Sequence, residues 1–113
     1  MHEMSLCMAL VELIGARAQS DGFTRVRRVV LEIGALSHVE PEAMAFGFEV
    51  STRGSVAEGA QLEIVTPPGE AWCVDCDANC RIERRGDGCP TCAGHKLVVT
   101  GGEELRLREL EVN

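Results

Sequence analysis

The sequence predicts an α+β fold, in which two helices lie on a small mixed or antiparallel sheet and a cysteine-rich module is inserted before the last strand. Two observations support the domain: segments with helical spacing of apolar residues, and three segments with strand-like alternation. The third observation is a pair of Cys-x-x-Cys motifs between the last two strand-like segments. The insertion predicts one domain from residues 1–69 plus 102–113 and a second from residues 70–101.

Residues 4–19 are expected to form the first helix. Its predicted apolar stripe follows helical spacing and consists of Leu6, Leu10, Leu13 and Ile14. We expect Ser5 to cap the helix and Gly22 to end it, because glycine accepts the left-handed conformation of a helix stop.

The second helix is expected to start at Glu40-Pro41, since proline suits the first helical position. Met44, Ala45 and Phe48 are predicted to form its apolar face. We expect Arg53-Gly54 to close it.

Residues 25–33, 61–65 and 103–112 are expected to be strands, because apolar residues alternate along them. In the last segment the alternation slips by one residue near Arg108-Glu109, which predicts a β-bulge. We expect this last strand to pair beside residues 61–65.

The two Cys-x-x-Cys pairs, Cys73/Cys76 and Cys89/Cys92, are separated by twelve residues. Such pairs form two tight turns that aim four sulfur atoms at one point, which suits tetrahedral Zn²⁺. The prediction is therefore a zinc-ribbon-like Zn(Cys)4 module with a structural role. Disulfides or a redox pair are the alternatives.

The chain has 113 residues and a net charge of −7, which argues against nucleic-acid binding. No signal peptide is expected, because acidic Glu3 and Glu12 stand where a basic region would be needed. No apolar run approaches the ~18 residues of a membrane span. Six cysteines without a secretory signal suit a reducing compartment, so we expect a cytoplasmic protein.

The N-terminus offers a second set of metal ligands. The Met1 α-amine, the next amide nitrogen and the His2 imidazole can converge on one ion, and Glu3 adds a carboxylate. Ni²⁺ and Cu²⁺ favour such nitrogen and oxygen ligands. The amine must lose its proton, and because its ordinary pKa is ~7.7–8.0, affinity should rise across neutral pH. From the residues alone, a chance histidine at position 2 is the competing interpretation.

The chain resembles the HypA/HybF family of nickel-insertion accessory proteins of [NiFe]-hydrogenase maturation. Besides the cysteine pairs, the matching segments are Met1-His2-Glu3-Met4-Ser5-Leu6, Ile33-Gly34-Ala35-Leu36-Ser37, Val39-Glu40-Pro41-Glu42, Phe46-Gly47-Phe48-Glu49, Gly59-Ala60-Gln61-Leu62-Glu63-Ile64, Gly102-Glu103-Glu104-Leu105 and Leu110-Glu111-Val112. They cover nearly the whole chain in order. Cys80 departs from the pattern, since the family usually has an aromatic or other apolar residue there.

The resemblance implies a nickel metallochaperone, not an enzyme, with Ni(II) as cargo and structural Zn(II). It implies that residues 1–69 plus 102–113 form the nickel-binding domain and residues 70–101 the zinc-binding domain. Nickel would be bound chiefly by His2, with the Met1 α-amine and Glu3 as co-ligands, and zinc by the four paired cysteines. The implied partners are the GTPase HypB and the hydrogenase large-subunit precursor, and the implied state is a monomer or a homodimer.

Two other functions compete with this one. A zinc-ribbon module could serve protein interaction without nickel transfer, or the thiols could serve a small redox enzyme. Closed four-cysteine coordination would leave no reactive thiol, which argues against the redox enzyme. Cys80 could be a spare buried thiol or could exchange with a zinc ligand, and His95 could approach zinc if a thiolate left.

Overall fold

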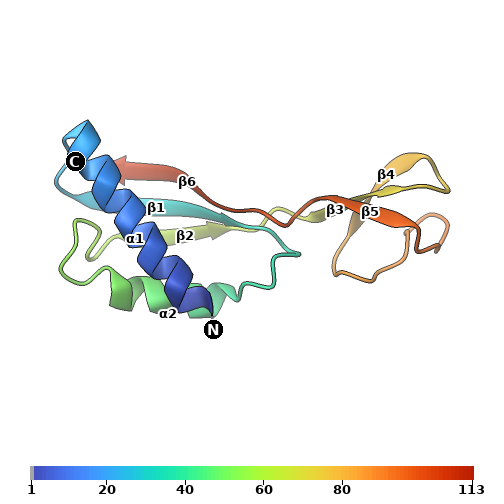
Figure 1. The fold of residues 1–113 in the computed structure, drawn as a ribbon, viewed down its shortest axis with the longest axis horizontal. Helices are drawn as coiled ribbons and strands as arrows, with labels where there is room; N and C mark the ends of the chain where they lie inside the picture. The colour runs from blue at the N-terminus through green and yellow to red at the C-terminus, as the bar shows by residue number, and fades with distance from the viewer. Residues whose placement is uncertain (1) are drawn as a thin grey trace. The chain divides into compact units, whose positions relative to one another are not determined.

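The computed structural model describes residues 2–113, which form two helices and two three-stranded sheets (Figure 1). In chain order the elements are α1 (His2–Asp21), β1 (Val26–Ile33), α2 (Pro41–Ser51), β2 (Gln61–Val65), β3 (Gly69–Cys73), β4 (Ala78–Ile82), β5 (Leu97–Gly101) and β6 (Leu105–Val112). The predicted α+β class is confirmed.

The chain divides into two compact units. Unit 1 contains residues up to Leu31, Val39–Ile64 and Leu107–Asn113, and unit 2 contains Glu32–His38 and Val65–Arg106. Unit 2 therefore takes in more of the chain than the predicted 70–101 module. The assignment of nickel to one domain and zinc to the other stays a prediction.

Helix α1 is longer than expected, and it buries a different stripe. It already includes His2, so Ser5 lies inside the helix and cannot be its cap. The predicted apolar stripe was wrong in part. Leu13 is 46% exposed, and Leu6 is only half-buried. The buried residues are Cys7, Leu10, Ile14 and Ala18. Cys7 and Ala18 have small side chains, which let this face of α1 pack closely against the elements beside it.

The end of α1 agrees with the prediction. The helix ends at Asp21, and Gly22 follows with φ 81°, the left-handed conformation that glycine adopts without steric cost. The Gly22 N–H donates to the Ala18 carbonyl at 2.9 Å, which satisfies one of the free carbonyls at the helix end.

Helix α2 packs against α1, and its buried residues are Met44, Gly47 and Phe48. Ala45 is exposed, so its predicted place on the apolar face was wrong, and Gly47 takes that place. A Cβ atom on Gly47 would stand 2.9 Å from the Cys7 sulfur, so the glycine allows the two helices to come close.

Strand β1 is the centre of the first sheet, which has the order β2-β1-β6. The prediction that the last strand pairs beside residues 61–65 was wrong, because β6 pairs with β1. All residues from Val29 to Ile33 are buried, whereas β2 and β6 are at most half-buried. A strand buried on both faces takes a central position. Arg28 of β1 accordingly forms ion pairs with Glu63 of β2 at 2.6 Å and Glu109 of β6 at 3.4 Å.

In unit 2, β3 lies between β4 and β5 and pairs antiparallel with both. The buried residues Leu36, Ala71 and Ile82 form a small core, against which Cys80, Leu97 and Val99 pack. Such a small core supplies little hydrophobic stabilisation by itself.

Three glycines of unit 2 let separate segments cross with their backbones in contact. A Cβ atom on Gly34 would overlap the Gly102 carbonyl, and one on Gly102 would lie 2.5 Å from the Gly69 Cα atom. Gly102 also has φ 91°. The Leu36 N–H donates to the Gly102 carbonyl at 2.7 Å, which ties two of these segments together.

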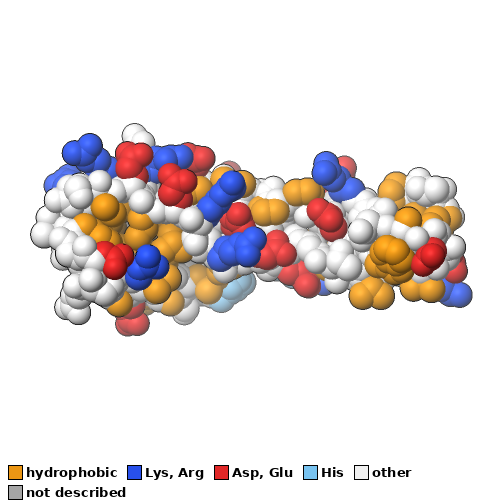
Figure 2. All heavy atoms as spheres, turned by 90° about the horizontal axis from the view of Figure 1, so that it is seen from above, with side chains coloured by type: hydrophobic (Ala, Val, Ile, Leu, Met, Phe, Trp, Pro, Cys, Tyr) orange, Lys and Arg blue, Asp and Glu red, His pale blue; other side chains and the backbone are white. Residues whose placement is uncertain are grey.

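The surface carries charges of both signs, and Figure 2 shows Lys and Arg interspersed with Asp and Glu rather than gathered on a basic face. Within residues 2–113, neither helix is long and apolar enough to span a membrane.

Candidate metal centre

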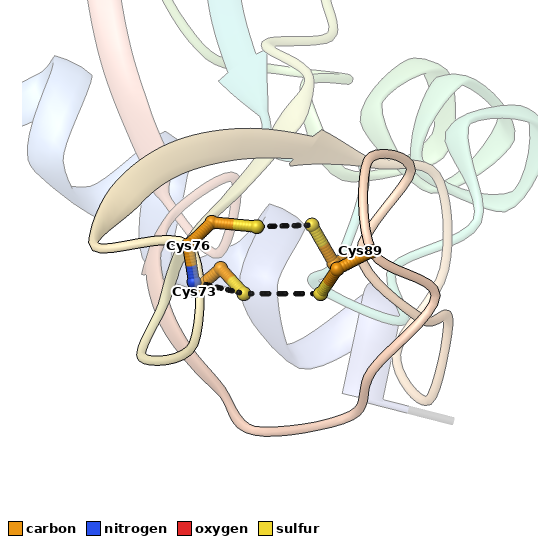
Figure 3. Close-up of side chains that lie close together, drawn as sticks. Cys73, Cys76 and Cys89 are labelled. Carbon is orange, nitrogen blue, oxygen red and sulfur yellow. Dashed lines mark hydrogen bonds between the residues drawn. The ribbon is translucent and has the colours of Figure 1, made fainter.

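The four paired cysteines lie together in unit 2. Cys73 ends β3, Cys76 lies in the turn between β3 and β4, and Cys89 and Cys92 lie in the loop before β5. All four sulfur atoms are within 4.8 Å of one another. The Cys73–Cys92 sulfurs are 3.7 Å apart and the Cys76–Cys89 sulfurs 3.9 Å apart, and Figure 3 shows Cys73, Cys76 and Cys89 turned toward one another.

These distances fit a tetrahedral metal ion. Zinc–sulfur bonds of about 2.3 Å place the corners of a tetrahedron about 3.8 Å apart. The cluster can therefore hold a soft or borderline metal ion, and four thiolates are a common zinc ligand set.

Backbone N–H groups also point at the sulfurs. The amides of Cys76, Thr91 and Gly94 donate to the sulfurs of Cys73, Cys89 and Cys92 respectively, each at 3.4 Å. Such bonds stabilise negative charge on sulfur. Thr91 and Gly94 were not predicted from the sequence, although each stands two residues after one of the paired cysteines and donates its amide to that sulfur.

The pKa values of Cys89 and Cys76 shift in opposite directions because their hydrogen-bond partners differ. Backbone N–H groups of Cys92 and Thr91 lower the pKa of Cys89 to about 6. Hydrogen bonds with the sulfurs of Cys92 and Cys73 raise the pKa of Cys76 to about 12. Crowding of the sulfurs thus disfavours negative charge on Cys76, and a bound divalent cation would favour the thiolate form of all four cysteines.

Cys80 and His95 stand outside this group. The half-buried Cys80 packs against the core of Leu36, Ala71 and Ile82, and His95 is exposed. Neither belongs to the cluster of four. Burial and the neighbouring Cys89 sulfur raise the pKa of the Cys80 thiol, so this thiol lies beside the cluster. The exchange of Cys80 or His95 with a zinc ligand stays a prediction.

The predicted nickel ligands lie at the start of α1. His2 is exposed, and Met1 is outside the described residues. The Glu3 carboxylate accepts a hydrogen bond from the Glu40 N–H at 3.2 Å, and this bond holds the pKa of Glu3 below its ordinary value. Glu40 immediately precedes α2 and has no side-chain cap of its own. Glu3 thus joins the beginnings of both helices, which the sequence analysis missed because the contact joins residues far apart in the chain.

Within residues 2–113, three or more potential metal ligands converge at one place, which is the cluster of the four paired cysteines. His2 and Glu3 are neighbours in sequence, but no third histidine, cysteine or carboxylate of the described residues converges with them. The nickel ligand set therefore stays a prediction.

Comparisons with known proteins identify the family. The family model described as "Hydrogenase/urease nickel incorporation, metallochaperone, hypA" matches residues 1–112. The "Hydrogenase maturation factor HypA" of Rhodopseudomonas palustris is 53% identical over 113 residues, 100% of both chains. That of Azotobacter vinelandii is 54% identical over 112 residues, 99% of both chains.

Solved structures agree with this match. The solution structure of the Ni metallochaperone HypA from Helicobacter pylori is similar with a TM-score of 0.70 and 30% identity, covering 99% of this chain and 97% of that one. The family resemblance of the sequence is confirmed by these matches. The chain belongs to the HypA family of hydrogenase/urease nickel-incorporation metallochaperones.

Proposed function

We propose that this protein is a nickel metallochaperone that delivers Ni(II) during maturation of [NiFe]-hydrogenase and carries a structural zinc ion. The observation that supports this function best is the family match over residues 1–112, which includes His2 and all four paired cysteines. The protein would act by binding and transfer, not by catalysis.

His2 is proposed as the principal nickel ligand, with the Met1 α-amine and Glu3 as co-ligands. His2 is exposed in the first turn of α1, where an ion is accessible to a recipient protein. Nitrogen and oxygen ligands suit Ni²⁺. The Glu3 carboxylate has further lone pairs besides the one that accepts from Glu40, so it can also reach a metal ion.

Zinc is proposed at Cys73, Cys76, Cys89 and Cys92. The spacing of the sulfurs and the N–H groups aimed at them support this assignment. Four protein ligands would leave no open position, so the ion would hold the loops of unit 2 together and would supply no chemistry.

The proposed partners are the GTPase HypB and the hydrogenase large-subunit precursor, in the cytoplasm. This proposal is supported by the name of the relatives, hydrogenase maturation factor. The protein would act as a monomer or a homodimer.

Replacing His2 with alanine is expected to weaken nickel binding at least tenfold, about 1.4 kcal/mol, because the principal nitrogen ligand is lost. Isothermal titration of the untagged protein with Ni²⁺ measures this change. His95→Ala is the matched control, since His95 is also exposed but lies in unit 2. Equal nickel affinity of His2→Ala and the unmodified protein would contradict the assignment.

An N-terminal tag tests the α-amine separately. A tag converts the Met1 amine into an amide, so we expect weaker nickel binding with zinc content unchanged at about one ion per chain. Nickel titration and zinc analysis of tagged and untagged protein give the comparison. Unchanged nickel affinity in the tagged protein would show that the amine is no ligand.

A protein-interaction module without nickel transfer is the second candidate. One observation favours it: Trp72, Val74 and Val98 are exposed on unit 2, and Trp72 lies opposite Val98 in the β3–β5 register. Figure 2 shows hydrophobic side chains gathered on the surface of unit 2. Nickel binding that is the same with and without His2 would favour this candidate.

A further inference from the structure

Sulfur atoms from both helices meet in unit 1, well away in sequence from the paired cysteines. The Cys7 sulfur of α1 lies 3.8 Å from the Met44 sulfur of α2, and its thiol donates to the Met44 carbonyl at 3.4 Å. Cys7 is 0% exposed and Met44 1% exposed. A thiol and a thioether are thus held in contact inside the interface between the helices.

A third sulfur stands at the surface beside this pair. The Ser51 hydroxyl donates to the Met4 sulfur at 3.4 Å, and Met4 is 37% exposed. The Cβ position of Gly47 lies 2.9 Å from the Cys7 sulfur and 3.8 Å from the Met4 sulfur. Both sulfurs therefore lie around the same point on α2, where Gly47 has no side chain.

We propose that Cys7, Met44 and Met4 form a binding site for a soft monovalent metal ion of the Cu(I) class. Thiolate and thioether ligands select such ions. Metal–sulfur bonds of about 2.3 Å at trigonal angles place two ligand sulfurs about 4 Å apart, close to the Cys7–Met44 separation.

Met4 is the third ligand, and it lies at the surface, where the metal ion would enter the site. Its side chain is unbranched and has three rotatable bonds, so it can leave Ser51 and turn inward at small cost. Cys7 and Met44 are already in contact, so two of the three ligands start close together.

Binding is an exchange of a proton for a metal ion. The Cys7 S–H bond breaks, the sulfur–metal bond forms, and the proton leaves to water. No electron is transferred, because the metal ion enters and remains in its monovalent state. The site differs in chemistry from the proposed nickel ligands, which are nitrogen and oxygen atoms, and the inference does not depend on them.

The test uses the whole zinc-loaded chain with ¹³C-labelled methionine methyl groups, titrated with Ag(I). Ag(I) is a monovalent soft ion that does not change oxidation state under these conditions. We expect the Met44 and Met4 methyl signals to shift as Ag(I) is added. The shift should be complete when one equivalent of Ag(I) has bound, not counting any Ag(I) that displaces zinc. A chromophoric chelator reports displaced zinc in the same sample. Met8 lies on the same helix and is 58% exposed, so its signal is the internal control and should stay in place.

Two variants complete the experiment. Cys7→Ser and Met44→Leu should each abolish the shift of the Met4 signal and lower the Ag(I) stoichiometry by one equivalent. Met44→Leu preserves volume, so it tests the site without opening a cavity. The proposal is overturned if the Met4 and Met44 signals stay unchanged while Ag(I) displaces zinc. It is also overturned if both variants bind as much Ag(I) as the unmodified chain.

Discussion

Replacing Cys73 with serine is expected to release zinc and to unfold unit 2. Cys73 is 0% exposed and ends the central strand of its sheet, so its sulfur is held where the other three meet. Structural zinc contributes about 10–16 kcal/mol to small modules, which rivals the whole stability of a typical domain, about 5–15 kcal/mol. The small core of Leu36, Ala71 and Ile82 cannot replace that contribution.

Zinc analysis and amide hydrogen exchange of β3 measure this outcome. Cys80→Ser is the matched control, because Cys80 lies on the neighbouring strand and outside the cluster. The Cys80→Ser variant should keep its zinc, and the amides of β3 should stay protected from hydrogen exchange. Only a small packing contribution of the Cys80 side chain should be lost. Full zinc content and unchanged exchange in Cys73→Ser would disprove the structural role of the cluster.

Replacing Gly102 with alanine is the second change with a large expected effect. Its φ of 91° costs an alanine about 1–2 kcal/mol. A Cβ atom there would also stand 2.5 Å from the Gly69 Cα and 2.7 Å from the Pro68 carbonyl oxygen, both rigid backbone atoms. Because overpacking adds about 1–3 kcal/mol, we expect a total loss of about 2–5 kcal/mol.

Gly86 provides a matched control for this substitution. It has the same φ of 91°, but nothing lies within 4 Å of its Cβ position. Gly86→Ala should therefore show the conformational cost alone. Denaturant unfolding of the two variants separates strain from contact, and equal losses would mean that the crossing of segments at Gly102 imposes no steric demand.

Local patterns in the sequence were sufficient to predict both helices, the strand at residues 61–65 and the approach of four cysteines. The stop of α1 at Gly22 and the start of α2 at Pro41 depend on residues within one turn. The two cysteine pairs are also local, because each turn is fixed by its own four residues.

The errors concern packing between distant segments. The predicted stripe of α1 was wrong at Leu13, because the buried face of the helix runs through the small residues Cys7 and Ala18 together with Leu10 and Ile14. The pairing of β6 depends on which strand is buried on both faces, and alternation within β6 does not contain that information. The Glu3–Glu40 bond is likewise invisible to any periodicity.

The division into units has a consequence for protein engineering. Unit 1 is assembled from three stretches of the chain and unit 2 from two, and the strands β1 and β6 each contribute residues to both. No single cut in the gene therefore yields either unit intact, and an isolated unit 1 would need two artificial joints. A fragment that ends within residues 32–106 would lose part of the sheet that supports α1, so truncation would confound any comparison of its metal sites.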